Sequence, residues 1–313
     1  MGRVARSNRR AVTAKLSQMW RLVRESHEQP MMGIARAPEA VGEGELGVTF
    51  IGHSSFFLQI AGRTLLVDPV FTKRLIVLRR QRRAGVDWRE LPPVDVVLLT
   101  HAHMDHLNVM SLRRTIRRTL KLTGKAPEVV VPKGVEDLVN KLGFAAVHAL
   151  KWWEHCSVEG LTVTMTPAKH WGARMFNDTH RGYGGYVVEG GGTSVYHSGD
   201  TAYFDGFREV GRRLAPQVAL LPIGAYFPDN YRAVHTNPEE ALRGFVETGA
   251  EVMVPMHFGT FRLGREPMDE PPVRLMAEAR RLGIERKVRV LEEGETLRVR
   301  ADQRVGARST RLG

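Results

Sequence analysis

The sequence is poor in cysteine and has no long apolar run. A single cysteine, Cys156, occurs in 313 residues, which excludes an intramolecular disulfide and any metal site built from several thiolates. No stretch approaches about 18 consecutive apolar residues, so no membrane-spanning helix is predicted. The basic N-terminus is not followed by the apolar core of about 7–15 residues that a signal peptide needs. We therefore expect a cytoplasmic protein, with peripheral contact at the inner face of the membrane as the alternative.

Lysine is also scarce, although the chain is strongly basic. It holds 37 arginines and 9 lysines against 34 acidic residues, which gives a formal net charge of +12. Such a surface favours phosphates, nucleic acid or acidic membranes as partners. A general arginine bias would explain the same count, so charge alone does not choose among them. With 42% hydrophobic residues, the chain can bury a large core, which excludes wholesale disorder.

Residues 1–45 are predicted to form a basic helical extension followed by a linker. Apolar side chains recur there at helical spacing, with basic residues on the other face: Val12, Leu16, Met19, Trp20 and Val23. Such a helix lies on an anionic membrane or packs against its own protein, and the sequence leaves both open. The stretch 30–47 is rich in proline and glycine and predicts the linker.

Residues 46–313 are predicted to form one α/β layered domain. Short β-rich runs such as VTFIG, DVVLLT and QVALLPI alternate with helical patterns, which is typical of layered α/β folds. The helical patterns cover residues 108–122, 134–142, 206–213, 237–248 and 271–282. Glycine-containing turns between some of the β-rich runs predict that antiparallel pairs are mixed in.

A dense group of metal-binding residue types follows one β-rich run. VVLLT ends at Thr100 and continues as HAHMDH, which supplies His101, His103, Asp105 and His106. Residues two apart in an extended chain point to the same side, so His101 and His103 can bind one ion together. After a turn, the other two can face a second ion. Imidazole and carboxylate ligands suit Zn²⁺, Mn²⁺ or Fe.

Three isolated residues come after other β-rich runs and can complete two metal shells. They are His170 in TPAKHW, Asp200 in YHSGD and His257 in VPMHFG. Strand ends in a layered α/β domain meet at one rim, so these residues are predicted to lie near HAHMDH. A carboxylate can give one oxygen to each of two ions, which makes Asp200 the natural bridge.

HAHMDH resembles the HxHxDH signature of the metallo-β-lactamase superfamily, whose fold is a four-layer αββα sandwich that binds two metals. Further stretches, including GDTAYF, LLPIGAY, NPEEA and HFGTF, resemble the N-acyl-phosphatidylethanolamine-hydrolysing phospholipase D branch and its bacterial relatives. The resemblance runs from about Thr49 to Pro272. It implies that His101, His103 and His170 hold one metal, that Asp105, His106 and His257 hold the other, and that Asp200 bridges them.

The resemblance implies a dinuclear hydrolase, with zinc as the first expectation and manganese or iron as alternatives. Two ions that share a hydroxide generate a nucleophile at neutral pH and neutralise charge in the transition state. We expect this hydroxide to attack the phosphorus of an N-acyl-phosphatidylethanolamine and release phosphatidic acid, with Asp105 and Asp200 as catalytic ligands. A phosphorylated sugar lactone, a cyclic nucleotide or RNA is the alternative substrate on the same centre.

Four further residues are candidates beside the site, and the same resemblance places three of them, His235, His53 and Asp68, there. His235, just before a helix start at Asn237–Pro238, is expected to contact substrate or to protonate the leaving group. His53 and Asp68 are expected to orient ligands, and His53 is also a candidate substrate contact. Tyr226 either lines the pocket or uses its hydroxyl within the fold.

One basic stretch is relevant to which partners the protein binds. Residues 73–83 place Leu75, Ile76, Val77 and Leu78 between cations, which suits either an exposed loop on an acidic lipid surface or a buried strand flanked by solvated charge. The alternative hypothesis is a protein that only binds nucleic acid. No recognition motif supports this hypothesis, and it does not explain the seven predicted metal ligands. No obligate nucleic acid is expected, and self-association is left open.

Overall fold

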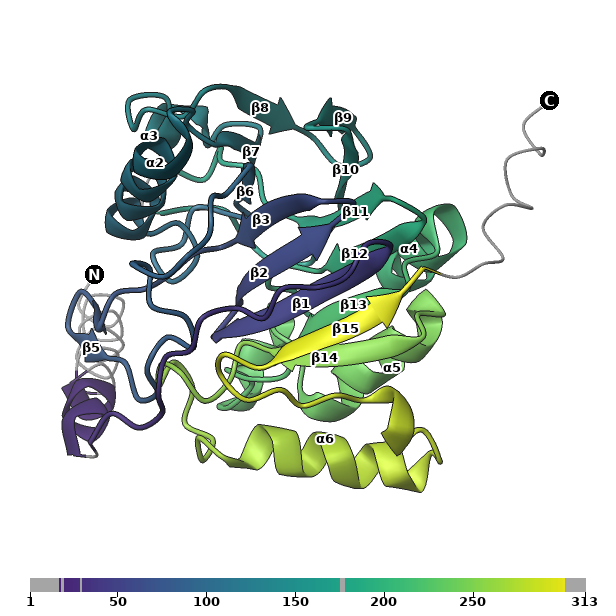
Figure 1. Cartoon of the computed structure of the whole chain (residues 1–313). Coiled ribbons are helices and arrows are strands. Elements are labelled where there is room, and N and C mark those ends of the chain that lie inside the picture. Colours follow the sequence, from purple (N-terminus) through teal and green to yellow (C-terminus); the bar gives the residue numbers. More distant parts are fainter. Residues whose placement is uncertain (1–16, 18–19, 29, 175–177, 302–313) are drawn as a thin grey trace, which may run out of the picture.

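The computed structural model describes residues 17, 20–28, 30–174 and 178–301 (Figure 1). Val12, Leu16 and Met19 of the predicted N-terminal helix lie outside these residues. Residues 20–28 are helical. None of the helices in the described part is long and apolar enough to cross a membrane.

The first sheet has seven strands and changes from antiparallel to parallel pairing at β3. Its order is β15 (Thr296–Arg300), β1 (Glu45–Gly52), β2 (Ser55–Ile60), β3 (Arg63–Val67), β6 (Val96–Leu98), β7 (Glu128–Pro132) and β8 (Val147–Leu150). The four strands from β15 to β3 pair antiparallel, and β3, β6, β7 and β8 pair parallel. The parallel strands all end toward the same edge, which brings the loop after β6 to that edge.

The second sheet has six strands and is likewise mixed. Its order is β14 (Val252–Met256), β13 (Val218–Pro222), β12 (Thr193–His197), β11 (Gly185–Gly190), β10 (Leu161–Thr166) and β9 (His155–Val158). The strands β9 to β12 pair antiparallel, and β12, β13 and β14 pair parallel. A separate two-stranded hairpin joins β4 (Arg74–Leu75) to β5 (Leu78–Arg79).

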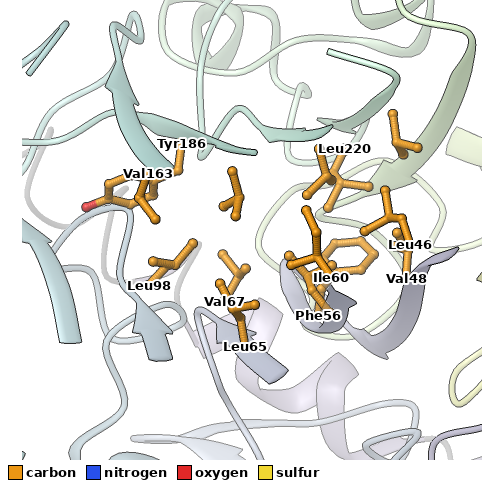
Figure 2. Close-up of a cluster of buried hydrophobic side chains, with 14 of the residues drawn as sticks. Leu46, Val48, Phe56, Ile60, Leu65, Val67, Leu98, Val163, Tyr186 and Leu220 are labelled. Carbon is orange, nitrogen blue, oxygen red and sulfur yellow. The ribbon is translucent and has the colours of Figure 1, made fainter. Parts of the chain in front are cut away.

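The two sheets face each other across the main hydrophobic core (Figure 2). Alternate residues of each strand point into it, as the period of two requires: Leu65 and Val67 from β3 face this core, whereas Leu66 between them belongs to the outer face. Val163 and Leu220 enter from the second sheet. Continuous apolar runs in both sheets are thus explained by burial on two faces.

Helices cover the outer face of each sheet and complete four layers. The first sheet packs against α2 (Val109–Thr123) and α3 (Glu136–Val139), and the second packs against α4 (Gly206–Leu214), α5 (Pro238–Thr248) and α6 (Glu270–Arg281). Two short 3₁₀ helices, η1 (Asp229–Ala233) and η2 (Glu285–Lys287), lie beside α5 and α6 in the chain. The predicted αββα architecture is confirmed, although α3 is shorter than its sequence pattern.

The stretch predicted as a linker runs along the loop that follows the hairpin. The backbone N–H of Met32 donates to Gln81 O at 2.9 Å, and that of Arg36 donates to Gly85 O at 2.7 Å. β1 begins at Glu45. The division into residues 1–45 and 46–313 stays a prediction.

Candidate metal centre

The predicted ligand residues meet at the edge where the parallel strands of both sheets end. The loop after β6 supplies His101, His103, Asp105 and His106, and the ends of β10, β12 and β14 lead to His170, Asp200 and His257. The turn between β1 and β2 adds His53. The structure therefore brings together all seven residues that the sequence marked as ligands.

Three imidazoles converge on one side of this group. His103 Nδ1 lies 2.8 Å from His101 Nε2 and 3.3 Å from His170 Nε2. The three rings meet nearly edge to face, and their nitrogens form a compact set of potential ligand atoms. The other ring nitrogen of His170, Nδ1, is 3.0 Å from Val234 O. A proton on Nδ1 would satisfy that carbonyl and leave the Nε2 lone pair facing the cluster.

A second group combines imidazoles with a carboxylate. His53, Asp105, His106 and His257 offer ligand-type atoms that lie within 4.8 Å of one another. Asp105 Oδ2 lies 3.0 Å from His53 Nε2 and 3.8 Å from the Nε2 atoms of both His106 and His257. The direct contact with His53 positions the Asp105 carboxylate.

Asp200 lies between the two groups. Its Oδ2 is 3.0 Å from His257 Nε2 and 3.2 Å from His106 Nε2 on one side. On the other side it is 3.9 Å from His170 Nε2 and 4.0 Å from His101 Nε2. This central position is the one that a carboxylate shared between two ions requires.

Several buried nitrogens and oxygens at the centre lack hydrogen-bond partners in the described part of the chain. Among the described residues, His106 Nε2, His257 Nε2 and Asp200 Oδ1 are buried without one. The short His257–Asp200 distance does not meet hydrogen-bond geometry, so proximity does not satisfy those atoms. Orphaned polar atoms inside a protein are costly, and their number here fits a group that accepts lone pairs, such as a metal ion. The structure thus shows buried His/Asp clusters suited to metal.

Asp68 orients one imidazole from each group. Its Oδ2 lies 2.6 Å from His106 Nδ1 and also accepts the Thr100 hydroxyl at 2.6 Å. Thr100 Oγ1 in turn lies 2.9 Å from His101 Nδ1. With protons on both Nδ1 atoms, a single carboxylate holds His106 directly and His101 through Thr100, so both Nε2 atoms face the centre.

Burial keeps the three-imidazole group neutral. It lowers the pKa of His170 to about 3 and moves the pKa of His101 well below its ordinary value, with further lowering by neighbouring imidazoles. The pKa of His103 is lowered too, chiefly by burial. Neutral imidazole is the form that binds metal.

In the carboxylate-containing group burial likewise lowers the pKa of His53, to about 4, but the other two imidazoles behave in the opposite way. Burial disfavours the charged forms of His106 and His257, but the charges of Asp200 and other carboxylates outweigh it. They raise the pKa of His106 well above its usual value and that of His257 to about 9. The same imidazoles hold the pKa values of Asp105 and Asp200 well below the ordinary range against the effect of burial.

Two histidines of the centre have left-handed backbones. His53 has φ 62° and His257 has φ 60°, a region that non-glycine residues seldom adopt. The backbone N–H of His257 donates to His53 O at 2.9 Å, and the N–H of His53 donates to Thr260 Oγ1 at 2.7 Å. These bonds hold the strained turns and fix where both imidazoles point.

His235 and Tyr226 differ in their relation to the centre. His235 Nε2 lies 3.8 Å from Asp200 Oδ2, with its ring stacked on that of His257 at 5.4 Å. The Tyr226 hydroxyl instead donates to Glu270 Oε1 on α6 at 2.7 Å, and Arg274 lies over its ring. The structure brings His235 to the cluster and engages the Tyr226 hydroxyl within the fold.

Sequence reasoning missed two residues that support the ligand loop. Thr100 precedes the motif directly and could have been noticed from that position. Arg174 Nη1 donates to the carbonyls of Ala102 at 2.8 Å and Leu107 at 2.9 Å, and so joins the two ends of the loop. Nothing in the sequence distinguishes Arg174 from the other arginines, of which the chain has 37 in all.

Comparison with known proteins agrees with this geometry. Residues 63–258 match the β-lactamase superfamily domain. A metal-dependent hydrolase of Methanopyrus kandleri is 32% identical over 80% of this chain and 98% of its own. The N-acyl-phosphatidylethanolamine-hydrolyzing phospholipase D 1 of Caenorhabditis elegans is 30% identical over 73% of this chain and 69% of its own. The structure of a metallo hydrolase from Ignicoccus hospitalis superposes with a TM-score of 0.61 at 26% identity, covering 82% of this chain and 98% of that one.

The αββα fold, the buried His/Asp clusters and the similarity to metal-dependent hydrolases together indicate a metal-dependent hydrolase. The chain belongs to the metallo-β-lactamase superfamily.

Proposed function

We propose that the protein is a dinuclear hydrolase, with zinc as the first choice of metal, that cleaves the phosphodiester of N-acyl-phosphatidylethanolamine-type phospholipids. The proposal rests chiefly on the central Asp200, whose Oδ2 lies within 4.0 Å of four imidazole nitrogens from the two groups and of His235 Nε2. The similarity to the C. elegans phospholipase supports the choice of substrate.

The residues divide into two ligand sets in this proposal. His101, His103 and His170 hold one ion, and Asp105, His106 and His257 hold the other, with Asp200 shared between them. Divalent ions bound there supply Lewis acidity, which lowers the pKa of a water molecule to about 7 and counters charge on a phosphoryl oxygen. Asp68 and Val234 O keep the imidazole lone pairs aimed inward.

The reaction also needs a residue beside the cluster that contacts the substrate, and His235 is the candidate. Water attacks phosphorus, the bond from phosphorus to the ethanolamine oxygen breaks, and a proton goes to that oxygen to release phosphatidic acid and an N-acylethanolamine. His235 is half-buried beside Asp200, and its Nδ1 has no partner in the described part of the chain. We assign it the substrate contact or the protonation of the leaving oxygen.

The exposed ring of Trp171 adds an apolar wall near the same imidazoles. It is 44% exposed and lies 4.3 Å from the ring of His170 and 4.8 Å from that of His103. An indole there can contact the acyl amide part of the substrate.

A substrate screen on zinc-loaded protein tests the proposal. N-acyl-phosphatidylethanolamine in detergent micelles is offered beside a phosphorylated sugar lactone, a cyclic nucleotide and RNA, with metal content measured on the same sample. We expect phosphatidic acid from the wild type and none from Asp200→Asn. Turnover of the lactone, the nucleotide or RNA with intact lipid would show that the lipid assignment is wrong.

A further inference from the structure

The tip of the β4–β5 hairpin exposes two aliphatic side chains between cations. Ile76 is 74% exposed and Val77 is 45% exposed at the two-residue turn. Lys73 and Arg74 precede them and Arg79 follows. The sequence left open an exposed loop or a buried strand, and the structure shows a hairpin with a buried Leu75 and an exposed tip.

The backbone of Ile76 makes this tip unusual. Its φ is 52°, in the left-handed region where glycine or asparagine is favoured and a β-branched residue is strained. The exposed side chain contributes little to the core, so fold stability does not explain an isoleucine at this position. Strain of this kind is typical of functional positions.

A basic groove of about 480 Å³ lies beside the hairpin. Five cations line it, against the single acidic side chain of Asp87: Lys73, Arg80, Arg83, Arg89 and Arg114. Asp87 pairs with Arg89 at 3.3 Å. Within the described ranges, Lys73, Arg83 and Arg114 form no ion pair, so their charge is available to an external anion.

The groove is also partly apolar. Met31, Phe71, Trp88 and Met110 contribute to its lining. The guanidinium groups of Arg89 and Arg114 lie 5.0 and 5.3 Å from the ring centroid of Trp88. Cations beside an aromatic and aliphatic lining suit a ligand that carries a phosphate next to hydrocarbon.

The hairpin is linked to the metal centre by direct packing. Leu75 packs with Val70 and Phe261 in a small core, and the Phe261 ring contacts the His53 ring edge to face at 5.4 Å. The fully buried Arg80 donates to Val70 O at 2.7 Å and lies over Phe261. A surface that binds at the hairpin is therefore held close to the centre.

The helix of residues 20–28 rests on the same element. Ser26 Oγ accepts the backbone N–H of Arg79 at 3.1 Å, and Ser26 O accepts the side-chain amide of Gln81 at 2.7 Å. Trp20 on this helix is 69% exposed. Figure 1 shows the helix beside β5, on the side of the molecule where the hairpin projects.

We propose that the hairpin and the basic groove dock the protein on an anionic lipid bilayer, with Ile76 and Val77 inserted and the three unpaired groove cations, Lys73, Arg83 and Arg114, on lipid phosphates. This inference deepens the proposed function and rests on it for its purpose, although docking itself needs no turnover. An aliphatic tip has no role in binding RNA, which is why we choose the bilayer over nucleic acid.

Vesicle co-sedimentation tests the docking, with phosphatidylcholine vesicles compared to vesicles that contain about one-third phosphatidylglycerol. We expect binding to the anionic vesicles that weakens as salt is raised. Replacing Lys73, Arg83 and Arg114 by glutamine should lower the affinity about fivefold for each charge, or roughly 100-fold together. The matched control replaces three exposed cations on the opposite helical layer: Arg280, Arg286 and Lys287. It should change binding by less than about threefold.

The tip is tested by Ile76→Gly combined with Val77→Ser. Because glycine accepts the left-handed backbone, Tm should stay equal or rise, while affinity for anionic vesicles falls by about tenfold or more. Val273→Ser is the control, since Val273 on α6 is 68% exposed and should leave vesicle binding unchanged.

Failures of the two proposals look different. Anionic vesicle binding without lipid hydrolysis would overturn the proposed substrate and leave the docking intact. Hydrolysis of micellar lipid with no vesicle binding would overturn the docking alone. Glutamine variants that lose binding to a single-stranded RNA probe but keep vesicle binding would also overturn it, in favour of nucleic acid.

Discussion

The two sheets contribute to the metal centre in different ways. The first sheet supplies four ligand-type residues from a single loop of six residues, His101 to His106. The second sheet supplies one residue per strand end: His170, Asp200 and His257. The loop is fixed by hydrogen bonds that involve the adjacent Thr100, Asp68 after β3, and Arg174 from the segment after β10. The single residues depend on the packing of the whole second sheet against the first.

This difference predicts where the centre is vulnerable. Changing Asp200, which lies between the two groups, should disable the whole centre, whereas changing a residue that supports the first-sheet loop should lower metal affinity only in part. Four substitutions, from the largest expected effect to the smallest, measure that contrast.

Asp200→Asn should have the largest effect. It keeps the side-chain volume but removes the carboxylate that lies directly between both groups, so we expect hydrolytic activity to fall by roughly 1000-fold or more. Steady-state kinetics and elemental analysis of the same sample check this. Asp205→Asn, the same change at an exposed position nearby in the chain, should retain activity. An Asp200→Asn protein with near-normal kcat/KM would show that the second sheet does not hold the centre.

Asp68→Asn should have the next largest effect. Losing the carboxylate leaves His106 and Thr100 without their acceptor, and partners of this kind typically account for about 10–100-fold in metal affinity or activity. Metal affinity by competition with a chelating dye is the measurement. Asp95→Asn is the control, because Asp95 accepts from Thr64 away from the centre. Equal metal affinity in wild type and Asp68→Asn would rule out the orienting role.

Arg174→Ala should act more weakly, by about tenfold in metal affinity, because two hydrogen bonds across the ligand loop are lost while the ligands remain. Arg174→Lys can restore one bond and should recover part of the loss. The same dye competition distinguishes the two variants. If alanine and lysine variants lose metal equally, or neither does, the loop is not held by these bonds.

Tyr226→Phe should change kcat/KM by less than about twofold, since the hydroxyl is bonded to Glu270. The lost bond should instead lower stability by about 1–2 kcal/mol, seen as a lower Tm. A large rise in KM with Tm unchanged would instead show that Tyr226 lines the substrate pocket.

Much of the fold followed from the sequence because its signals are local. Period-two alternation and apolar runs predicted the strands, and Asn237 with Pro238 marked the start of α5, where the Asn237 side chain accepts from Glu240 N–H. The pattern over 134–142 gave only the short α3, since hydrophobic periodicity does not show how many turns can pack. The order of strands in each sheet could not be derived, because pairing is decided by long-range contacts.

The grouping of the seven centre residues was also accessible, since strand ends meet at one edge. Of the contacts that support these residues, the resemblance predicted those of Asp68 and His53 but not those of Thr100 and Arg174. Arg174 donates to backbone carbonyls, and because every residue has one, no residue type in the sequence marks such a contact. The left-handed turns at His53 and His257 arise from a backbone bond between distant segments. The groove beside the hairpin likewise joins residues 31–35, 71–89 and 110–114, which no single stretch reveals.

Metal content measured together with activity tests the central claim most directly. Elemental analysis of the purified protein should find about two divalent ions per chain. Removal with a chelator should abolish hydrolysis, and adding Zn²⁺ back should restore it along with the second equivalent of metal. A protein that is fully active while carrying no metal would contradict the assignment of these histidines and aspartates as a metal centre.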